Sequence, residues 1–356
     1  MKFILALMLI STSFRAYSYS KNMNKRGLLV SKEMQVNPEL GLNIANKFVS
    51  KIGWFYSYNH TLTDEWIKWA NKNSVQFVPM VWGRWIKWGD KKCKFGEKGC
   101  DAKKLMKVMR PTLEKLKGRA RPKWFMGANE PWNQVQSNLT PYEAVEIWRK
   151  YLQPAADKLG LKLISPNFTE KEEELEWTAN FLKRCNDFAK DKAYPCTLGK
   201  IKAFGIHTYK CKESHWNRHY GKGNKIRKSL KLKMADYGEK SSKWWGQYIG
   251  KRKFWVTETN CNWDGDAPSS EEQCKRITGK RKRSHGIGSI NHMINNNKIM
   301  GFAWWHTYNE IKIKRALNAR LSYKGGVLKP VGRAYLRPNK KTNCKWHLFT
   351  KKTCNS

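Results

Sequence analysis

The sequence predicts an α/β fold of the (β/α)8 TIM-barrel type, in a single domain that contains disulfides. Short apolar stretches alternate with amphipathic stretches of helical period, which indicates a repeated βα unit and a parallel sheet. Eight apolar stretches occur, and eight parallel strands close a barrel. An open doubly wound sheet is the alternative, but it usually carries a glycine-rich phosphate turn after its first strand, and this sequence has none there.

The eight expected strands are short and rich in branched and aromatic residues. The fourth must end near Glu130, because Pro131 cannot continue a central strand. In chain order the expected strands are Arg26–Val30, Ile52–Asn59, Val75–Gly83, Lys123–Asn129, Leu161–Pro166, Ala203–Tyr209, Phe254–Thr259 and Met300–Thr307.

The helical stretches lie between these strands. Thr140-Pro-Tyr-Glu predicts a helix start with a capping box and proline at the first position. The expected helices are Asp64–Asn71, Lys103–Lys117, Thr140–Leu159, Leu175–Ala189 and one or two helices within Ser269–Asn296.

The two ends of the chain differ from this pattern. Residues 1–18 are typical of a secretory signal peptide, with a charged start, the apolar run Phe3–Ile10 and the small-x-small motif Ala16-Tyr17-Ser18. The barrel is therefore expected over residues 19–336, followed by a basic tail over residues 337–356. No later stretch is apolar enough to span a membrane, so we expect a secreted, extracellular protein.

Export permits disulfides, and the chain has nine cysteines. Three pairs lie close in sequence: Cys93 with Cys100, Cys185 with Cys196, and Cys344 with Cys354, the last of which would close the tail. The odd count leaves at least one thiol over. The chain also has three glycosylation sequons, at Asn59, Asn138 and Asn167, of which Asn138 lies in a turn and is the best glycan candidate.

The chain carries 70 basic and 28 acidic residues, a formal net charge of +42. Such a field attracts polyanions, so an anionic cell wall or mucus is a candidate partner. A solvated lysine-rich surface is the simpler interpretation. No nucleic-acid-binding motif accompanies the charge, so no specific nucleic acid is expected, and we expect a monomer.

Two carboxylates end strands of the expected barrel, Glu130 after the fourth and Glu258 after the seventh. Carboxyl ends of barrel strands meet at one mouth, so both are expected there. A carboxylate pair across a cleft is what glycoside hydrolysis needs: one group protonates the leaving oxygen, and the other attacks the sugar or activates water. Ionised Glu258 should also raise the pKa of Glu130 and keep a proton on it. A single glutamate at a strand end would more often be a solvated or salt-bridged loop residue.

Other polar and aromatic residues end strands at the same mouth. His207 and Tyr209 share one face of the sixth strand and could orient Glu258, although a satisfied interior histidine is nearly as common. Aromatic faces stack on sugar rings, and several at one mouth favour a carbohydrate cleft. The aromatic candidates are Tyr56, Trp82, Trp132, Trp304 and Trp305.

Other chemistries lack their motifs. The chain has no Gly-x-Ser-x-Gly elbow, no His-Glu-x-x-His and no phosphate-binding loop. It has no Cys-x-x-Cys, and its histidines are scattered. We therefore expect neither a metal nor another cofactor.

Several blocks of the sequence together resemble the secreted endo-β-1,3-glucanases of glycoside hydrolase family 128. The resemblance runs from about Arg26 to Tyr335. The blocks are Ile52–Asn59 (IGWFYSYN), Phe77–Gly83 (FVPMVWG), Gly127–Pro131 (GANEP), Gln136–Pro141 (QSNLTP), Ser165-Pro166, Ile206–Tyr209 (IHTY), Trp255–Glu258 (WVTE) and Leu328–Tyr335 (LKPVGRAY).

The resemblance implies a (β/α)8 barrel that acts on β-1,3-glucan by a retaining mechanism. Glu130 matches the family's acid/base and Glu258 its nucleophile, while Asn129 matches the asparagine that contacts the sugar beside the bond. The chain departs from the family at Trp132, where Asp is common, at Thr259, where an apolar residue is common, and at Thr208, where Trp is found.

Three rivals to this function remain open. They are a related barrel glycosidase on another polysaccharide, a glycan-binding protein without turnover, and a cationic surface-active protein.

Overall fold

The computed structural model describes residues 25–221, 223–235, 242–263, 268–280, 288–311, 314–339 and 341–345. The expected signal peptide over residues 1–18 and the cysteine at 354 lie outside these ranges, and the division into leader, barrel and tail stays a prediction. None of the described helices is long and apolar enough to cross a membrane.

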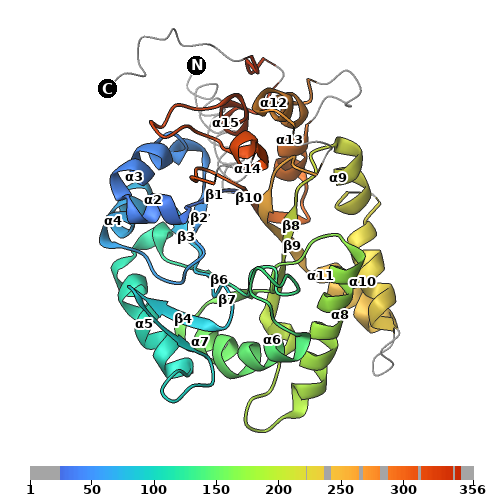
Figure 1. Cartoon of the computed structure of the whole chain (residues 1–356). Helices are drawn as coiled ribbons and strands as arrows, with labels where there is room; N and C mark the ends of the chain where they lie inside the picture. The colour runs from blue at the N-terminus through green and yellow to red at the C-terminus, as the bar shows by residue number, and fades with distance from the viewer. Residues whose placement is uncertain are drawn as a thin grey trace, which may run out of the picture.

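The strands form one eight-stranded sheet of order β3-β2-β1-β10-β9-β8-β7-β6, in which every neighbouring pair is parallel. Between β3 and β6 the ring is completed by a parallel bridge, Met80 with Met126, and by the Val81 N–H, which donates to the Met126 carbonyl at 3.1 Å. The predicted barrel is therefore confirmed, with helices around the strands (Figure 1). The strands are β1 Arg26–Leu29, β2 Trp54–Tyr56, β3 Gln76–Phe77, β6 Trp124–Met126, β7 Lys162–Ile164, β8 Ile201–Thr208, β9 Lys253–Thr259 and β10 Ile299–Trp304.

The five predicted helical stretches are all helical, and the capping box at Thr140 is present. The stretch from Pro141 to Leu159 is α6, a π-helical turn and α7 in succession, and the described parts of Ser269–Asn296 hold two helices. The helices are α2 Lys32–Val36, α3 Pro38–Asn46, α4 Asp64–Asn73, α5 Ala102–Lys115, α6 Pro141–Ile147, α7 Gln153–Leu159, α8 Glu172–Asp187, α9 Glu213–His219, α10 Lys225–Ala235, α11 Ser242–Lys251, α12 Ser270–Thr278, α13 Ser289–Asn295, α14 Lys314–Ala319 and α15 Pro330–Leu336.

An antiparallel hairpin that the sequence analysis did not predict follows β3. It pairs β4 (Trp85–Trp88) with β5 (Lys91–Lys94), and a disulfide between Cys93 and Cys100 fixes its end. The hairpin adds a small two-stranded sheet to the side of the barrel (Figure 1).

Two apolar layers hold the barrel together. The interior layer includes Leu29, Trp54, Met126 and Trp255, and the outer layer lies between strands and helices. Space inside is tight: a Cβ on Gly205 would lie 2.1 Å from the Asn167 side-chain oxygen, so the wall at β8 requires glycine.

Four disulfides are formed among the described residues, and they confirm two of the three expected close pairs. These two are Cys93–Cys100 and Cys185–Cys196. The expected pairing of Cys344 with Cys354 is wrong, because Cys344 is bonded to Cys274 in α12 across a sequence separation of 70. The fourth disulfide, Cys211–Cys261, joins the loops after β8 and β9.

Candidate active site

Glu130 lies where β6 has ended, and its backbone is held in an uncommon conformation. Its φ is 40°, in the left-handed region that residues with a Cβ rarely adopt. Gly127 makes the approach possible, since a Cβ there would lie 2.9 Å from both the Pro166 nitrogen and the Trp148 ring. The Asn129 N–H donates to the Trp82 carbonyl at 2.9 Å. Such strain is typical of functional sites, where the surrounding structure fixes a side chain against its own preference.

Glu258 reaches the same place from β9, and the strand register explains why. In the parallel pair β8–β9, His207 is the partner of Glu258. The register of this pair shifts between Ile206 and His207, so that Thr257 is an extra residue on β9, and its hydroxyl donates to the Asn167 side-chain oxygen at 3.1 Å. Glu258 therefore points toward His207 with only 4% of its side chain exposed.

The two carboxylates and His207 converge. One nitrogen of His207 and one oxygen of each glutamate all lie within 4.8 Å of one another. His207 Nδ1 is 2.8 Å from Glu130 Oε1 and 3.7 Å from Glu258 Oε2. The prediction that both glutamates meet at the mouth is therefore right in its geometry.

Tyrosine hydroxyls hold the carboxylates from the other side. Tyr209 lies between the two, 2.5 Å from Glu258 Oε2 and 3.2 Å from Glu130 Oε1. Tyr58 donates to the second oxygen of Glu258 at 2.7 Å. Asn133 donates to Glu130 Oε2 at 3.1 Å. Each carboxylate thus has a fixed orientation before any substrate arrives, which is the preorganisation that catalysis requires.

The pKa of Glu130 is shifted in the direction opposite to the one expected from the sequence. Burial raises the pKa of Glu130, but hydrogen bonds from His207, Asn133 and Tyr209 outweigh burial and bring that pKa below its ordinary value. The pKa of Glu258 is raised, first because the side chain is fully buried and then because it faces the charge of Glu130. The expectation that Glu258 would raise the pKa of Glu130 is wrong in its outcome, since it left out the imidazole beside Glu130.

The two carboxylates also shift the pKa of His207. Burial alone would lower this pKa, but the charges of Glu258 and Glu130 outweigh burial and raise it. In its protonated form His207 would donate from Nδ1 to Glu130 Oε1.

Among the described residues, Glu130, His207 and Glu258 form the group of metal-ligating residue types whose spacing could admit a metal ion. Their oxygens already accept hydrogen bonds from Tyr58, Tyr209 and Asn133, with distances of 2.5–3.2 Å. This donor set suits proton transfer between carboxyl groups, since a cation would have to compete with those donors for the same lone pairs.

The predicted aromatic contacts divide into two groups. Trp82, Trp132 and Trp305 are partly exposed, and Trp305 packs edge-on against Tyr209 with ring centroids 5.8 Å apart. Tyr56 and Trp304 are 0% and 1% exposed, and they donate to the carbonyls of Thr257 and Ala319. These last two side chains support the barrel and present no surface to a sugar, which corrects their expected role.

Asn129 is also nearly enclosed, with 3% of its surface exposed. Its side-chain nitrogen donates to Gln136 at 3.3 Å, while its buried oxygen has no hydrogen-bond partner among the described residues. The expected contact of Asn129 with a sugar stays a prediction, since this oxygen presents no surface to a ligand.

Sequence analysis missed three residues of the site. Tyr58 follows Tyr56 at a spacing of two, so alternation along the expected strand could have indicated it. Asn133 and Trp263 lie in loops, where no periodic signal exists. Trp263 packs against Tyr209 at 4.8 Å, and Lys171 Nζ lies 4.7 Å from the Trp263 ring centroid.

Comparison of the sequence with known proteins gives one match. The sequence profile described as glycosyl hydrolase catalytic core matches residues 38–335. No curated protein sequence matches the chain.

Solved structures are similar over most of the chain, at low sequence identity. A subgroup II endo-β-1,3-glucanase of glycoside hydrolase family 128 from Sorangium cellulosum is 18% identical, with a TM-score of 0.55, over 89% of this chain and 99% of its own. A subgroup III curdlan-specific exo-β-1,3-glucanase from Blastomyces gilchristii, in complex with glucose, is 19% identical over 89% of this chain and 99% of its own, with a TM-score of 0.51. A subgroup I endo-β-1,3-glucanase from Amycolatopsis mediterranei, in complex with laminaritriose, is 16% identical over 89% and 100% of the two chains, also with a TM-score of 0.51. At these identities the likeness establishes the fold.

Proposed function

The chain belongs to the glycosyl hydrolase catalytic core family, and from this premise we propose that it is a secreted β-1,3-glucanase that acts with retention of anomeric configuration. The observation that carries the proposal is the convergence of Glu130 and Glu258 at the mouth of the barrel. The sequence blocks shared with glycoside hydrolase family 128 support β-1,3-glucan as the substrate, as do the printed activities of the similar solved structures.

The spacing of the carboxylates supports retention. Their nearest oxygens lie within 4.8 Å. Retaining glycosidases have carboxyl groups about 5–5.5 Å apart, whereas inverting enzymes leave about 6.5–9.5 Å for a water molecule. The short separation of the oxygens therefore favours retention over inversion.

In the first step, Glu130 protonates the glycosidic oxygen while Glu258 attacks the anomeric carbon. The bond from that carbon to the leaving oxygen breaks, and a covalent ester to Glu258 forms. In the second step, Glu130 takes a proton from water, the water oxygen attacks the same carbon, and Glu258 leaves as a carboxylate. Tyr58 and Tyr209 hold Glu258 on the line of attack throughout.

Export of the protein is part of the proposal. Four disulfides among the described residues suit an oxidising compartment, and the first residues of the sequence are typical of a signal peptide. Detection of the mature chain in the culture medium, with a new N-terminus after Ser18, would support export.

The test is the release of reducing ends from laminarin and curdlan, with a panel of other β-glucans beside them. Wild type should hydrolyse β-1,3-glucan, and both Glu130→Gln and Glu258→Gln should lose at least about 10³-fold in kcat while remaining folded. NMR of the first product should show the β-anomer. Hydrolysis of another glucan alone would assign a different substrate, and folded wild type without activity on any glucan would refute the proposal.

A further inference from the structure

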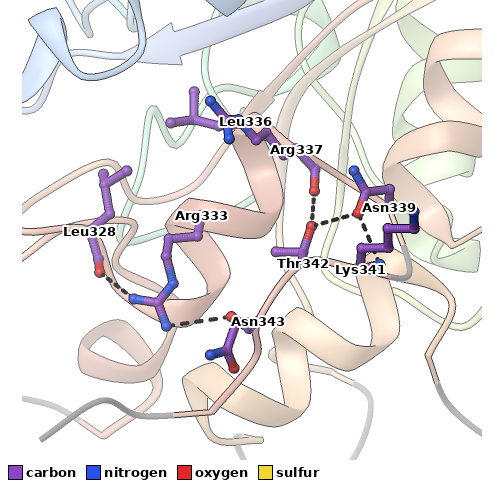
Figure 2. A pocket seen from close by; sticks show the side chains of 8 residues that line it. All are labelled: Leu328, Arg333, Leu336, Arg337, Asn339, Lys341, Thr342 and Asn343. Carbon is purple, nitrogen blue, oxygen red and sulfur yellow. Dashed lines mark hydrogen bonds between the residues drawn. The ribbon is translucent and has the colours of Figure 1, made fainter.

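A pocket of about 500 Å³ lies beside α15 and the segment that follows it, and its wall is basic. Figure 2 shows the eight residues that line it. Three of them are cationic, three are neutral and polar, two are leucines, and none is acidic: Arg333, Arg337, Lys341, Asn339, Thr342, Asn343, Leu328 and Leu336.

The pocket is a fixed part of the fold. Cys344, which follows its last lining residue, is bonded to Cys274 in α12. The Thr342 hydroxyl donates to the Arg337 carbonyl, and the Thr342 N–H donates to the Asn339 carbonyl at 3.1 Å. The turn that carries Lys341 is therefore held in place by covalent and hydrogen bonds.

Arg333 has no acidic partner in the part of the chain that the structure describes. Its guanidinium donates to the carbonyls of Leu328 at 3.0 Å and Lys345 at 2.9 Å, and its buried Nε has no hydrogen-bond partner among the same residues. Among the described residues, no carboxylate lies within ion-pair distance of Arg333, Arg337 or Lys341. A concave surface that gathers cations without counter-charges attracts an anion.

The Leu336 end of the pocket lies near the start of a barrel strand, away from the two glutamates. Arg26 begins β1, and its guanidinium approaches the Leu336 carbonyl at 3.5 Å. Glu130 and Glu258 lie at the carboxyl ends of their strands, and the eight strands of the barrel are parallel. A ligand held at the Leu336 end would therefore leave the mouth open.

We propose that Arg333, Arg337 and Lys341 form a binding site for an acidic polysaccharide, which holds the protein on an anionic matrix. Arginine recognises both carboxylate and sulfate groups in planar hydrogen-bonded pairs. The volume falls within the range of about 300–1,000 Å³ that is typical of small-ligand sites, and it suits one or two sugar rings. The leucines can contact ring carbons, and Asn339 and Asn343 can bond hydroxyls. A concave site suits a single substituent on a sugar better than the regular phosphate backbone of a duplex.

The test measures binding of the full chain, with no requirement for hydrolysis. The probes are polygalacturonate for carboxylates, dextran sulfate for sulfates, neutral dextran as the uncharged control, and duplex DNA as the competing class of polyanion. The pocket variant is Arg337→Gln/Lys341→Gln. Its matched control is Lys107→Gln/Arg110→Gln, which removes the same charge from a second basic hollow on α5 that also contains Glu114.

At low ionic strength, wild type should bind at least one acidic polysaccharide and not neutral dextran. Since a basic residue at an anionic surface contributes roughly fivefold in affinity, the pocket variant should bind about thirtyfold more weakly, and the control variant should change less than about threefold. Both variants should hydrolyse neutral laminarin as wild type does. Because the binding measurement needs no hydrolysis, its result holds even if the proposed glucanase activity is not found.

Three results would overturn the inference. Equal losses in the pocket and control variants would assign the binding to the basic surface as a whole. If wild type binds neither polygalacturonate nor dextran sulfate, the proposed site is refuted. Tighter binding to DNA, with the same dependence on the pocket, would assign a nucleic acid as the ligand.

Discussion

The Tyr58→Phe variant removes one hydroxyl and thereby measures the contribution of one hydrogen bond to Glu258. This hydroxyl donates to Glu258 Oε1 at 2.7 Å, and phenylalanine keeps the ring without the donor. In the proposed mechanism Glu258 regains its negative charge as it leaves the sugar in the second step. The missing donor should therefore slow the hydrolysis of the covalent intermediate more than its formation.

The magnitude follows from the kind of bond that is lost. Hydrogen bonds to charged groups contribute about 1.5–3 kcal/mol, and 1.36 kcal/mol changes a rate tenfold, so kcat should fall by about 10- to 150-fold. The same donor lowers the pKa of Glu258, so its removal should raise that pKa further. Because Glu258 must be ionised to attack, the acid limb of the pH profile should move to higher pH.

The assay is pre-steady-state release of an aryl alcohol from an aryl β-laminaribioside. A burst of one equivalent, followed by a slow steady state, would show that the glycosyl-enzyme accumulates in Tyr58→Phe. The matched control is Tyr142→Phe on α6, whose side chain is 50% exposed and which should behave as wild type. An unchanged kcat with an unmoved acid limb would refute the role of Tyr58.

Three further predictions concern ionisation, disulfide and packing. The charges of Glu258 and Glu130 raise the pKa of His207 against the effect of burial. This pKa should therefore fall when a 2-fluoro glycoside traps Glu258 as a neutral ester, and NMR titration of the free and the trapped protein measures the change. Cys211→Ser/Cys261→Ser should lower the free energy of unfolding by about 4 kcal/mol in denaturant titration, since this disulfide closes a separation of 50 residues; a loss under about 1 kcal/mol would contradict the expectation. Gly205→Ala should lower the free energy of unfolding by at least about 1–3 kcal/mol, because its Cβ would lie 2.1 Å from a buried amide oxygen, and a variant as stable as wild type would show that the barrel wall can relax.

The barrel was predictable because its strands are buried on both faces and therefore appear as continuous apolar runs. The structure shortens most of them: the run at Ile52–Asn59 contains the strand Trp54–Tyr56. Apolar residues continue beyond the last ladder hydrogen bond, since the loops at the mouth are also buried. Hydrophobicity therefore marks the place of a strand better than its end.

Other features depend on contacts that no local pattern encodes. The pairing of Cys344 with Cys274 arises because the segment after α15 packs against α12, whereas proximity in sequence favoured Cys354. The hairpin is a different case, because its two-residue turn Gly89-Asp90 is a local hairpin signal that the sequence analysis passed over. Only the pairing of Cys344 depends on the three-dimensional arrangement.

The convergence of Glu130 and Glu258 was predictable because topology alone brings them to one mouth. Their relative acidity was not, because it depends on the position of a third charged group. A carboxylate facing another carboxylate should hold a proton, but His207 at 2.8 Å reverses the direction for Glu130. A difference of about one ångström in the position of an imidazole determines such a shift, and residue spacing carries no information at that scale.

The lowered pKa of Glu130 is compatible with its proposed role as acid and base when the cluster is considered as a whole. Glu130 must give a proton in the first step and take one in the second, so a strongly raised pKa would help the first step and hinder the second. In the free site the charge of Glu258 raises the pKa of His207, whose Nδ1 lies 2.8 Å from Glu130 Oε1. When Glu258 becomes an ester, that charge disappears and the pKa of His207 should fall. The loss of one charge thus favours the unprotonated form of His207 at the point in the cycle where water has to be deprotonated.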